Sequence, residues 1–190
     1  MRRVAVVTSA SGSGGTTFGR AIAERLCVPF HELDALFWQP RWTESETEAF
    51  RARVVAVVAT EDWVIDGSYQ SKLGDLVLRN ADVVIWLDLP MRVWLPRLVR
   101  RTLSRAIRRE ELWAGNRESL RNTFLSRNSL ILFTLRHYGR RRRLYPERFA
   151  SFALVRLRSQ REVEGFLRSV ERETGAPQPT LPHEARARSA

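Results

Sequence analysis

Short apolar runs alternate along the chain with longer segments whose apolar residues recur every three or four positions. A short apolar run between glycine, proline or serine residues is typical of a buried strand, whereas the longer period is that of an amphipathic helix. Five segments have the strand pattern: residues 3–9, 28–34, 63–66, 83–87 and 152–159. Because strands and helices alternate, we predict an α/β fold with a five-stranded parallel sheet flanked by helices.

Capping patterns and periodicity place the helices. Two overlapping Ser/Thr-x-x-Glu patterns, at residues 43–46 and 45–48, predict the start of one helix, and a third at 159–162 predicts the start of the last one. A long arginine-rich stretch at about residues 93–145 also has helical periodicity, with an interruption at the sequence LWAGN. Pro96 should kink this helix or delay its start, because proline has no backbone N–H to donate.

Length and composition are those of one folded domain. The chain has 190 residues, of which 44% are hydrophobic, and we expect a single domain over residues 1–172. Residues 173–190 contain three prolines and no apolar periodicity, which predicts a disordered tail. The single cysteine, Cys27, has no partner for an internal disulfide, and we expect it to be a small core residue. With no secretory signal and no long apolar run, we expect a cytoplasmic protein without a membrane segment.

The net charge of +11 is concentrated in one segment. Residues 92–148 contain 16 arginines and four glutamates, whereas the remainder has 16 basic and 17 acidic residues. Such a segment attracts phosphate, either on nucleotides or along a nucleic acid backbone. An arginine-rich codon bias explains why Lys72 is the one lysine, but not the clustering. We expect Arg140 to Arg143 to be a solvated helix face, and this run is also the best nucleic-acid candidate.

Residues 9–26, SASGSGGTTFGRAIAERL, have the form of a phosphate-binding loop that opens into a helix. Aligned with the pattern G-x-x-x-x-G-K-[ST], the loop has Ser9 in place of the first glycine and Gly15 in place of the lysine. Backbone amides of the loop and the N-terminus of the helix can still bind an anion, although an ordinary strand-to-helix turn is the alternative. The residues expected at the phosphates are Gly12, Ser13, Gly14, Gly15, Thr16 and Thr17.

Six segments, in this order, resemble those of a known group of proteins. They are SASGSGGTTFGRAIAERL, ELDALFWQPRW, WVIDGSYQ, VVIWLDLP, RLVRRTL and ELWAGNRESLRN. The chain resembles the adenylate-kinase-like branch of the P-loop nucleoside and nucleotide kinases, and among these the small bacterial adenylate kinase-like or DNA topology modulation proteins, to about residue 172. This resemblance implies a P-loop NTPase fold, an arginine-rich helical lid at about residues 97–130, and ATP and Mg²⁺ as cofactors.

The resemblance also implies a magnesium site. Thr16 would ligate Mg²⁺ through its hydroxyl, and Asp66 would lie near the metal at the end of the neighbouring strand. A carboxylate at the C-terminal edge of a buried parallel strand, beside the phosphate loop, can hold a hydrated Mg²⁺. Asp88 also ends a predicted strand and is a competing candidate, unless it is a turn or cap residue before Pro90. In adenylate kinases the stretch that matches Asp88 leads into the lid, which favours Asp66.

Asp34 follows the second predicted strand, where related small-molecule kinases carry a carboxylate that orients the acceptor hydroxyl. A carboxylate there can accept the proton of the acceptor or fix its position, and a strand-end cap is the alternative role. Four aromatic residues lie in the region that would close over the acceptor, where they would either stack on a base or sugar or belong to the core: Phe37, Trp38, Trp42 and Tyr69.

Arginines of the lid complete the predicted site. Arg97 and Arg101 match family arginines that contact the nucleotide base and phosphates, and Arg100 lies beside them. Guanidinium groups suit this role because they bind phosphate oxygens bidentately. Three further arginines could approach from the far side of the lid: Arg117, Arg121 and Arg127.

The absence of the loop lysine bears directly on the function that we predict. Without a cation at Gly15, catalysis suffers more than binding, because the backbone amides remain while the transition state loses a charged partner. Arg101 or Arg117 could replace the lysine, and Arg20 is a poorer candidate because it should point away from the loop. We therefore expect a phosphotransferase that moves the ATP γ-phosphate to a nucleoside, nucleotide or other small acceptor. The alternative is an inactive kinase homologue that binds nucleotide or nucleic acid.

Overall fold

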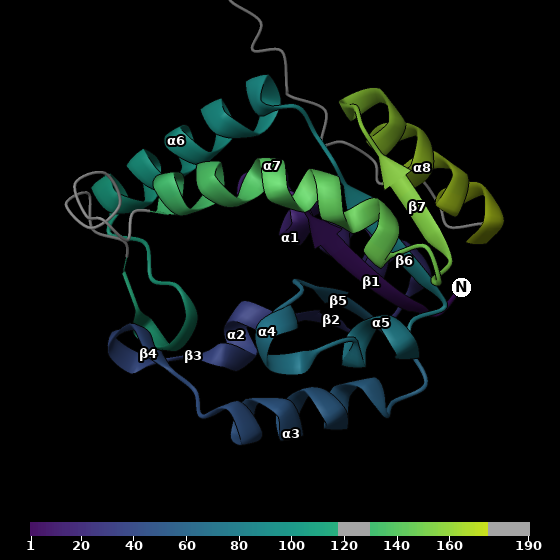
Figure 1. Ribbon diagram of the computed structural model, residues 1–190, viewed down its shortest axis with the longest axis horizontal. Coiled ribbons are helices and arrows are strands. Elements are labelled where there is room, and N and C mark those ends of the chain that lie inside the picture. The colour runs from purple at the N-terminus through teal and green to yellow at the C-terminus, as the bar shows by residue number, and fades with distance from the viewer. Residues whose placement is uncertain (118–129, 175–190) are drawn as a thin grey trace, which may run out of the picture.

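The computed structural model describes residues 1–117 and 130–174 (Figure 1). The main sheet consists of β1 (Arg3–Thr8), β2 (Phe30–Glu32), β5 (Trp63–Asp66), β6 (Val83–Leu87) and β7 (Leu154–Leu157). The helices are α1 (Gly15–Leu26), α2 (Leu33–Phe37), α3 (Thr47–Val58), α4 (Gln70–Leu73), α5 (Leu76–Asn80), α6 (Met91–Arg108), α7 (Leu130–Arg148) and α8 (Gln160–Thr174). A small hairpin, β3 (Trp38–Gln39) and β4 (Thr43–Glu44), encloses the 3-10 turn η1 (Pro40–Trp42), and a second turn, η2 (Trp113–Gly115), lies between α6 and α7.

The five main strands pair in the order β2-β5-β1-β6-β7, and all four pairs are parallel. The prediction of a five-stranded parallel sheet flanked by helices is confirmed. The strand order reverses at β1, whose C-terminal end leads into the glycine-rich loop. In open parallel sheets, ligands bind at this kind of reversal point, outside the carboxyl ends of the strands.

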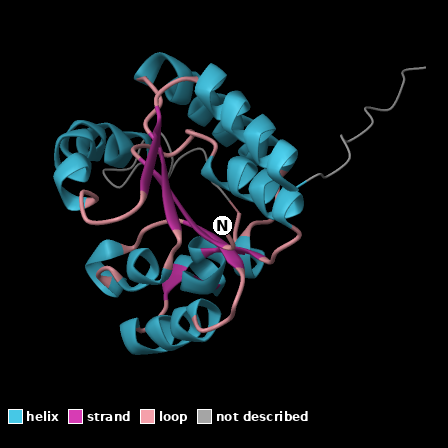
Figure 2. Cartoon of the chain, turned by 90° about the vertical axis from the view of Figure 1, so that its right-hand side faces the viewer, coloured by secondary structure: helices cyan, strands magenta, loops and turns pink. Residues whose placement is uncertain are grey.

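Helices cover both faces of the sheet, because successive strand residues point to opposite sides. Val4 and Val6 of β1 belong to the core formed with α1 and α8. Ala5 and Val7 belong to the core formed with α2, α3, α5 and the end of α7. Figure 2 shows the strands in the middle of the molecule with helices on both sides.

A third cluster joins the phosphate loop to the arginine-rich helices. Ala10 packs with Trp94 and Leu98 of α6 and with Tyr138 of α7. Gly12 is needed at this contact, because its φ is +86° and a Cβ there would lie 2.6 Å from the carbonyl oxygen of Trp94. The loop is therefore packed against α6. No helix within the described ranges is long and apolar enough to span a membrane.

The capping predictions have mixed outcomes. The helix predicted near residue 45 is α3, but its N-cap residue is Glu46, which makes no side-chain cap hydrogen bond. Ser45 instead donates to the carbonyl of Phe37 at 2.5 Å and accepts a hydrogen bond from Gln39. These bonds connect Ser45 to the β3–β4 hairpin rather than to the first turn of α3. Because the helix has no side-chain cap, both predicted capping boxes are wrong. The third box is confirmed, because Ser159 accepts a hydrogen bond from the backbone N–H of Glu162 at 3.2 Å.

Three further expectations can be compared with the structure. Helix α6 begins at Met91, five residues before Pro96, so the proline does not delay its start. Cys27 is exposed rather than part of the core, because it ends α1 in a left-handed conformation with φ of 53°. The predicted tail falls outside the described residues from position 175, and the predicted lid does so over residues 118–129.

Candidate active site

The loop after β1 leads into the N-terminus of α1 at the C-terminal end of the central strand. Gly12 and Gly14 have φ angles of +86° and +88°, which glycine adopts without strain. The N-cap residue of α1 is Gly14, which has no side chain to cap the first turn. The N–H groups at the start of α1 are therefore oriented toward the loop, where the helix dipole favours an anion.

The loop and α6 line one cavity of about 820 Å³. Its floor includes Gly12, Ser13, Gly14 and Thr17, and α8 contributes Gln160. The arginines that line it all come from α6: Arg97, Arg100, Arg101, Arg105 and Arg108. A cavity of this size is in the range that small-molecule sites occupy. The structure thus brings four of the six predicted loop residues together with Arg97 and Arg101, whereas Gly15 and Thr16 do not line this cavity.

Thr16 and Asp66 form a pair at the edge of this loop. The Thr16 hydroxyl donates to Oδ2 of Asp66 at 2.8 Å. Burial raises the pKa of Asp66 to about 7, and the bond from Thr16 partly opposes this shift. Hydroxyl and carboxylate oxygens are ligands that Mg²⁺ accepts, so the donor set fits that ion.

The position of Asp66 also accounts for Gly15. A Cβ on Gly15 would collide with the Asp66 carboxylate and would lie 3.0 Å from Cγ2 of Thr8. A lysine at position 15 has no room in this arrangement. The sequence shows that the loop lysine is absent. It does not show that the Asp66 carboxylate lies beside Gly15, because Gly15 and Asp66 are 51 positions apart.

Asp34 and Arg101 complete the group around Asp66. Asp34 is the second residue of the short helix α2 and accepts a hydrogen bond of 2.5 Å from the hydroxyl of Tyr69. Burial raises the pKa of Asp34, and the bond from Tyr69 opposes the shift. The positive charge of Arg101 lowers the pKa of both carboxyls, Asp34 and Asp66. Arg101 therefore lines the loop cavity and also acts electrostatically on the two carboxyls.

Arg117 is in a different place from Arg101. Its guanidinium pairs with Glu111 at 2.5 Å and is half exposed, and its backbone carbonyl accepts a hydrogen bond from the indole of Trp42. It does not line the cavity beside the loop. Arg20 pairs with Glu32 at 3.0 Å and does not line the cavity beside the loop. Arg121 and Arg127 lie outside the described residues.

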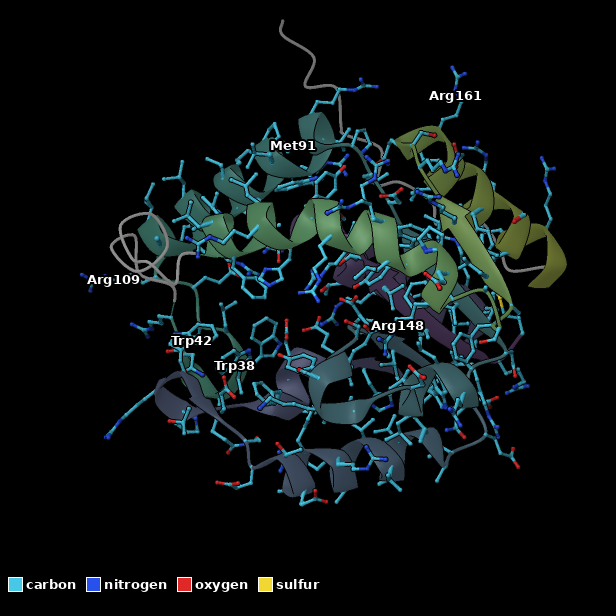
Figure 3. The ribbon with its side chains drawn as sticks, viewed as in Figure 1. Trp38, Trp42, Met91, Arg109, Arg148 and Arg161 are labelled. Carbon is cyan, nitrogen blue, oxygen red and sulfur yellow. The ribbon has the colours of Figure 1, made fainter. Side chains whose placement is uncertain are left out.

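The four predicted aromatic residues divide into two groups. Phe37 is buried and packs with Phe50 and Tyr69, so it belongs to the core. Trp38 and Trp42 are half-buried and meet edge to face, with ring centres 5.4 Å apart. Figure 3 shows these two tryptophans close together on the left of the view.

Sequence reasoning missed Trp113 and Glu32, which extend the aromatic group. Trp113 packs edge to face on Trp42, with ring centres 6.4 Å apart, and its indole N–H donates to Glu32 at 2.7 Å. Both residues lie inside segments that carried the family resemblance, ELDALFW and ELWAGN. Their contact joins the segment after α6 to the end of β2.

Asp88 is the centre of a buried network rather than an open ligand. Its side chain is fully buried, and it pairs with Arg156 of β7 at 2.6 Å and with Arg142 of α7 at 2.8 Å. The hydroxyl of Ser9 donates to Asp88 at 3.0 Å and accepts a hydrogen bond of 2.8 Å from the indole of Trp86. Ser9 therefore replaces the usual glycine with a side chain that anchors the loop.

The run of four arginines on α7 is only partly a solvated face. Arg140 and Arg143 are exposed, as expected. Arg142 is instead committed to Asp88. The side chain of Arg141 extends toward the loop, with a contact of 3.5 Å to the carbonyl oxygen of Ser9. The side chain of Arg142 is nevertheless 42% exposed, so the expectation of a solvated face fails only at the half-buried Arg141.

Comparison with known proteins identifies the fold. The chain is similar to the shikimate kinase from Acinetobacter baumannii in complex with shikimate, with a TM-score of 0.56 and 15% identity over 92% of this chain and 94% of that one. It is similar to a gluconokinase from Sinorhizobium meliloti 1021, with a TM-score of 0.51 and 19% identity over 92% and 91% of the two chains. The M. mycoides deoxyadenosine kinase with bound dATP has a TM-score of 0.51 and 12% identity over 91% and 99%. The chain has the P-loop kinase fold.

Sequence comparison adds one relative. The uncharacterized protein YqaC of Bacillus subtilis (strain 168) is 27% identical over 132 residues, which cover 68% of this chain and 73% of YqaC. No protein-family model matches the sequence. The main result of the comparison is therefore structural: the chain shares its fold with solved structures of small-molecule kinases.

Proposed function

We propose that this protein is an ATP-dependent phosphotransferase that moves the γ-phosphoryl group of ATP to a hydroxyl group of a small acceptor. The observation that carries the proposal is the cavity lined both by the glycine loop and by arginines of α6. The loop offers backbone amides to the phosphates, and Arg97 and Arg100 offer charge-assisted hydrogen bonds to the nucleotide. This is the arrangement expected of a nucleoside or nucleotide kinase.

In this proposal Arg101 takes the role of the missing lysine. Phosphoryl transfer spreads negative charge over the oxygens of the transferred group, and a fixed guanidinium stabilises that charge. Arg101 lines the loop cavity and acts electrostatically on Asp34 and Asp66. Arg117 lacks this placement because it pairs with Glu111.

Asp34 and the Thr16–Asp66 pair have separate roles. Asp34 orients the acceptor hydroxyl and accepts its proton, and Tyr69 holds the carboxylate in place through its short hydrogen bond. Thr16 and Asp66 would hold Mg²⁺, which when bound neutralises charge on the terminal phosphates. Asp66, half-buried at the end of β5, fixes the position of that pair relative to the loop.

Two measurements test the proposal. Calorimetry with MgATP should detect binding at the loop, and this binding should be lost in Gly12→Ala, whose Cβ would displace α6. A coupled assay for ADP release over a panel of hydroxyl acceptors should detect transfer. If MgATP binds but no acceptor in the panel stimulates ADP release, the transferase is rejected. If nucleotide does not bind, the site assignment itself is rejected.

One observation favours a second candidate, a nucleic-acid-binding protein that does not transfer phosphate. Exposed arginines continue beyond the cavity along α6 and α7, including Arg92, Arg136, Arg140 and Arg143. Binding of a labelled duplex through such contacts would weaken steeply with salt, because it releases counterions. A flat salt dependence would exclude this candidate.

A further inference from the structure

The helix that carries Asp34 is too short to be stable without tertiary contacts. Helix α2 has 5 residues, Leu33–Phe37, and no side-chain cap at its start. Forming the first turn of a helix fixes several residues for a single hydrogen bond, so short helices depend on their surroundings. Leu33 and Phe37 pack in the core. Because apolar packing is non-directional, it does not by itself determine where the half-buried Asp34 is placed.

Residues 112–116, which follow α6 in the chain, bond to both ends of this helix. The indole N–H of Trp113 donates to Glu32, the residue before α2, at 2.7 Å. The side-chain amide of Asn116 donates to the carbonyl of Gln39, just after α2, at 2.9 Å. The turn η2 also contacts α2 and β3 (Figure 1). The two ends of α2 are thus held by residues 81 and 77 positions away in the sequence.

Asn116 is the centre of this contact, and its side chain is fully used there. The residue is buried, with 4% of its surface exposed. Its amide oxygen accepts the backbone N–H of Trp42 at 2.7 Å, and its amide nitrogen donates to the carbonyls of Gln39 and Trp113. An asparagine amide has two N–H donors and one acceptor oxygen. Few side chains other than asparagine could therefore make the same set of bonds.

The two turns that Asn116 joins have backbone conformations that need support. Arg41 and Trp42 of η1 and Ala114 of η2 have φ angles of 60°, 56° and 54°. Residues with a Cβ rarely adopt this left-handed region, and they remain in it only where surrounding contacts impose it. Asn116 binds the N–H of Trp42 in one turn and the carbonyl of Trp113 in the other. The amide therefore fixes the two turns relative to each other.

We propose that Asn116 is a positioning residue for phosphoryl transfer, which acts on Asp34 by holding helix α2 in place. The inference rests on the proposed phosphotransferase function. In that reaction the acceptor oxygen forms a bond to the γ-phosphorus, and the bond from this phosphorus to the bridging oxygen breaks. ADP leaves with the electron pair, and the hydroxyl proton passes to Asp34. Transfer therefore depends on where α2 places this carboxylate.

The position of Asn116 predicts an effect on transfer but not on nucleotide binding. Neither Asn116 nor any residue of α2 lines the cavity formed by the glycine loop and the arginines of α6. Loss of the amide should displace Asp34 and leave that cavity intact. A displacement of about 1 Å at a reacting group can lower the rate by about 100-fold.

Asn116→Ala tests the proposal, with Asn80→Ala as the matched control. Asn80 also donates from its amide to a backbone carbonyl, that of Leu76 at 2.8 Å, but it ends α5, which carries none of the proposed site residues. Calorimetry with MgATP would give Kd and the fraction of protein able to bind. The coupled ADP-release assay would give kcat and the KM for MgATP, with the acceptor of the panel that the wild type uses fastest.

We expect Asn116→Ala to bind MgATP with the stoichiometry, Kd and KM of the wild type, while kcat falls by about 100-fold. Asn80→Ala should keep the wild-type kcat. An unchanged kcat in Asn116→Ala would overturn the proposal. So would a loss of kcat that is matched by a loss of binding stoichiometry, because unfolded protein would then account for it.

Two further variants separate the hydrogen bonds from the volume of the side chain. Asn116→Asp keeps the shape and the oxygen that accepts from Trp42, but its carboxylate cannot donate to Gln39, so kcat should fall as in Asn116→Ala. Trp113→Phe removes the bond to Glu32 at the other end of α2 and should also lower kcat. The double variant Asn116→Ala/Trp113→Phe should lose less than the product of the two single effects, because both act on one helix. Effects that multiply would overturn the action through α2.

Hydrogen exchange tests the placement of α2 without turnover. Peptides that cover residues 33–42 should exchange faster in Asn116→Ala than in the wild type and Asn80→Ala, because local opening becomes easier. Peptides that cover residues 9–17 should exchange equally in all three proteins. Unchanged exchange over residues 33–42 would overturn the proposal. A wild type that releases no ADP with any acceptor would instead reject the proposed function, and the exchange result would still decide whether Asn116 holds α2.

Discussion

The carboxylate of Asp66 occupies the space that any side chain at Gly15 would need. The same carboxylate accepts the hydrogen bond from Thr16 at 2.8 Å. The absence of lysine from the loop is thus coupled to the position of a strand residue. Position 15 of this loop accommodates a glycine, and a lysine there would require Asp66 to move.

Restoring the lysine should therefore harm the protein. We expect Gly15→Lys to lower the free energy of unfolding by about 1–3 kcal/mol, the usual cost of overpacking, and to leave ADP release no higher than in wild type. Urea denaturation and the coupled assay would measure the two effects. Gly14→Ala is the control for backbone strain alone, because its Cβ would meet no atom within 4 Å although its φ is +88°. Higher turnover in Gly15→Lys would contradict the steric account.

Replacing Ser9 with the first glycine of the P-loop pattern, Ser9→Gly, should also destabilise the fold. The change removes the hydroxyl that accepts from Trp86 and donates to Asp88. A buried donor left without a partner costs about 1–3 kcal/mol, which urea denaturation can resolve. Ser13→Ala is the matched control, because the Ser13 hydroxyl has no hydrogen-bond partner in the described part of the chain. Equal losses in the two variants would show that the network is not responsible.

Arg101 and Arg117 should differ in their effect on transfer. We expect Arg101→Ala to reduce kcat by about 10³-fold, at the lower end of the range for a catalytic arginine in phosphoryl transfer. Arg117→Ala breaks a half-exposed ion pair with Glu111, an interaction worth about 0–1 kcal/mol, so kcat should change by less than about tenfold. Single-turnover kinetics with saturating MgATP would separate transfer from binding. The reverse order would assign the role of the lysine to Arg117.

The pKa of Asp66 predicts how stability varies with pH. Its folded-state pKa of about 7 is above the ordinary value of 3.8, so between these values the folded protein holds a proton that the unfolded chain releases. Stability from this group is therefore greatest near pH 4 and falls toward pH 7, by at most about 1.4 kcal/mol per pH unit. Urea denaturation with chelator present would compare wild type with Asp66→Asn, in which this slope should disappear. If the free energy of unfolding changed with pH in the same way in both proteins, the assignment of the slope to Asp66 would be refuted.

The sequence predicted the sheet better than the site. Strands 63–66 and 83–87 have the predicted bounds, because uniform apolar runs mark buried parallel strands. The capping boxes near residue 45 failed because tertiary contacts of Ser45 outweighed its local capping preference. A helix start predicted from a short Ser/Thr-x-x-Glu pattern is wrong when the Ser or Thr side chain bonds to another backbone group instead of the helix N-terminus.

Within the site, residues close to the loop in sequence could be predicted, whereas long-range pairs could be predicted only where the family resemblance supplied them. Thr16 and Asp66 were placed together through the family resemblance. The bond between Trp113 and Glu32 joins residues 81 positions apart, and nothing in local spacing indicates it. The ion pair of Arg142 with Asp88 was hidden in the same way, inside an arginine run whose other members are largely solvated.

The contacts of Asp88 connect three separate segments of the chain. Arg142 joins α7 to the carboxylate that follows β6, and Arg156 joins β7 to the same carboxylate. Ser9, at the start of the phosphate-binding loop, donates a hydrogen bond to it as well. Removal of this one buried carboxylate would therefore loosen α7, β7 and the loop together.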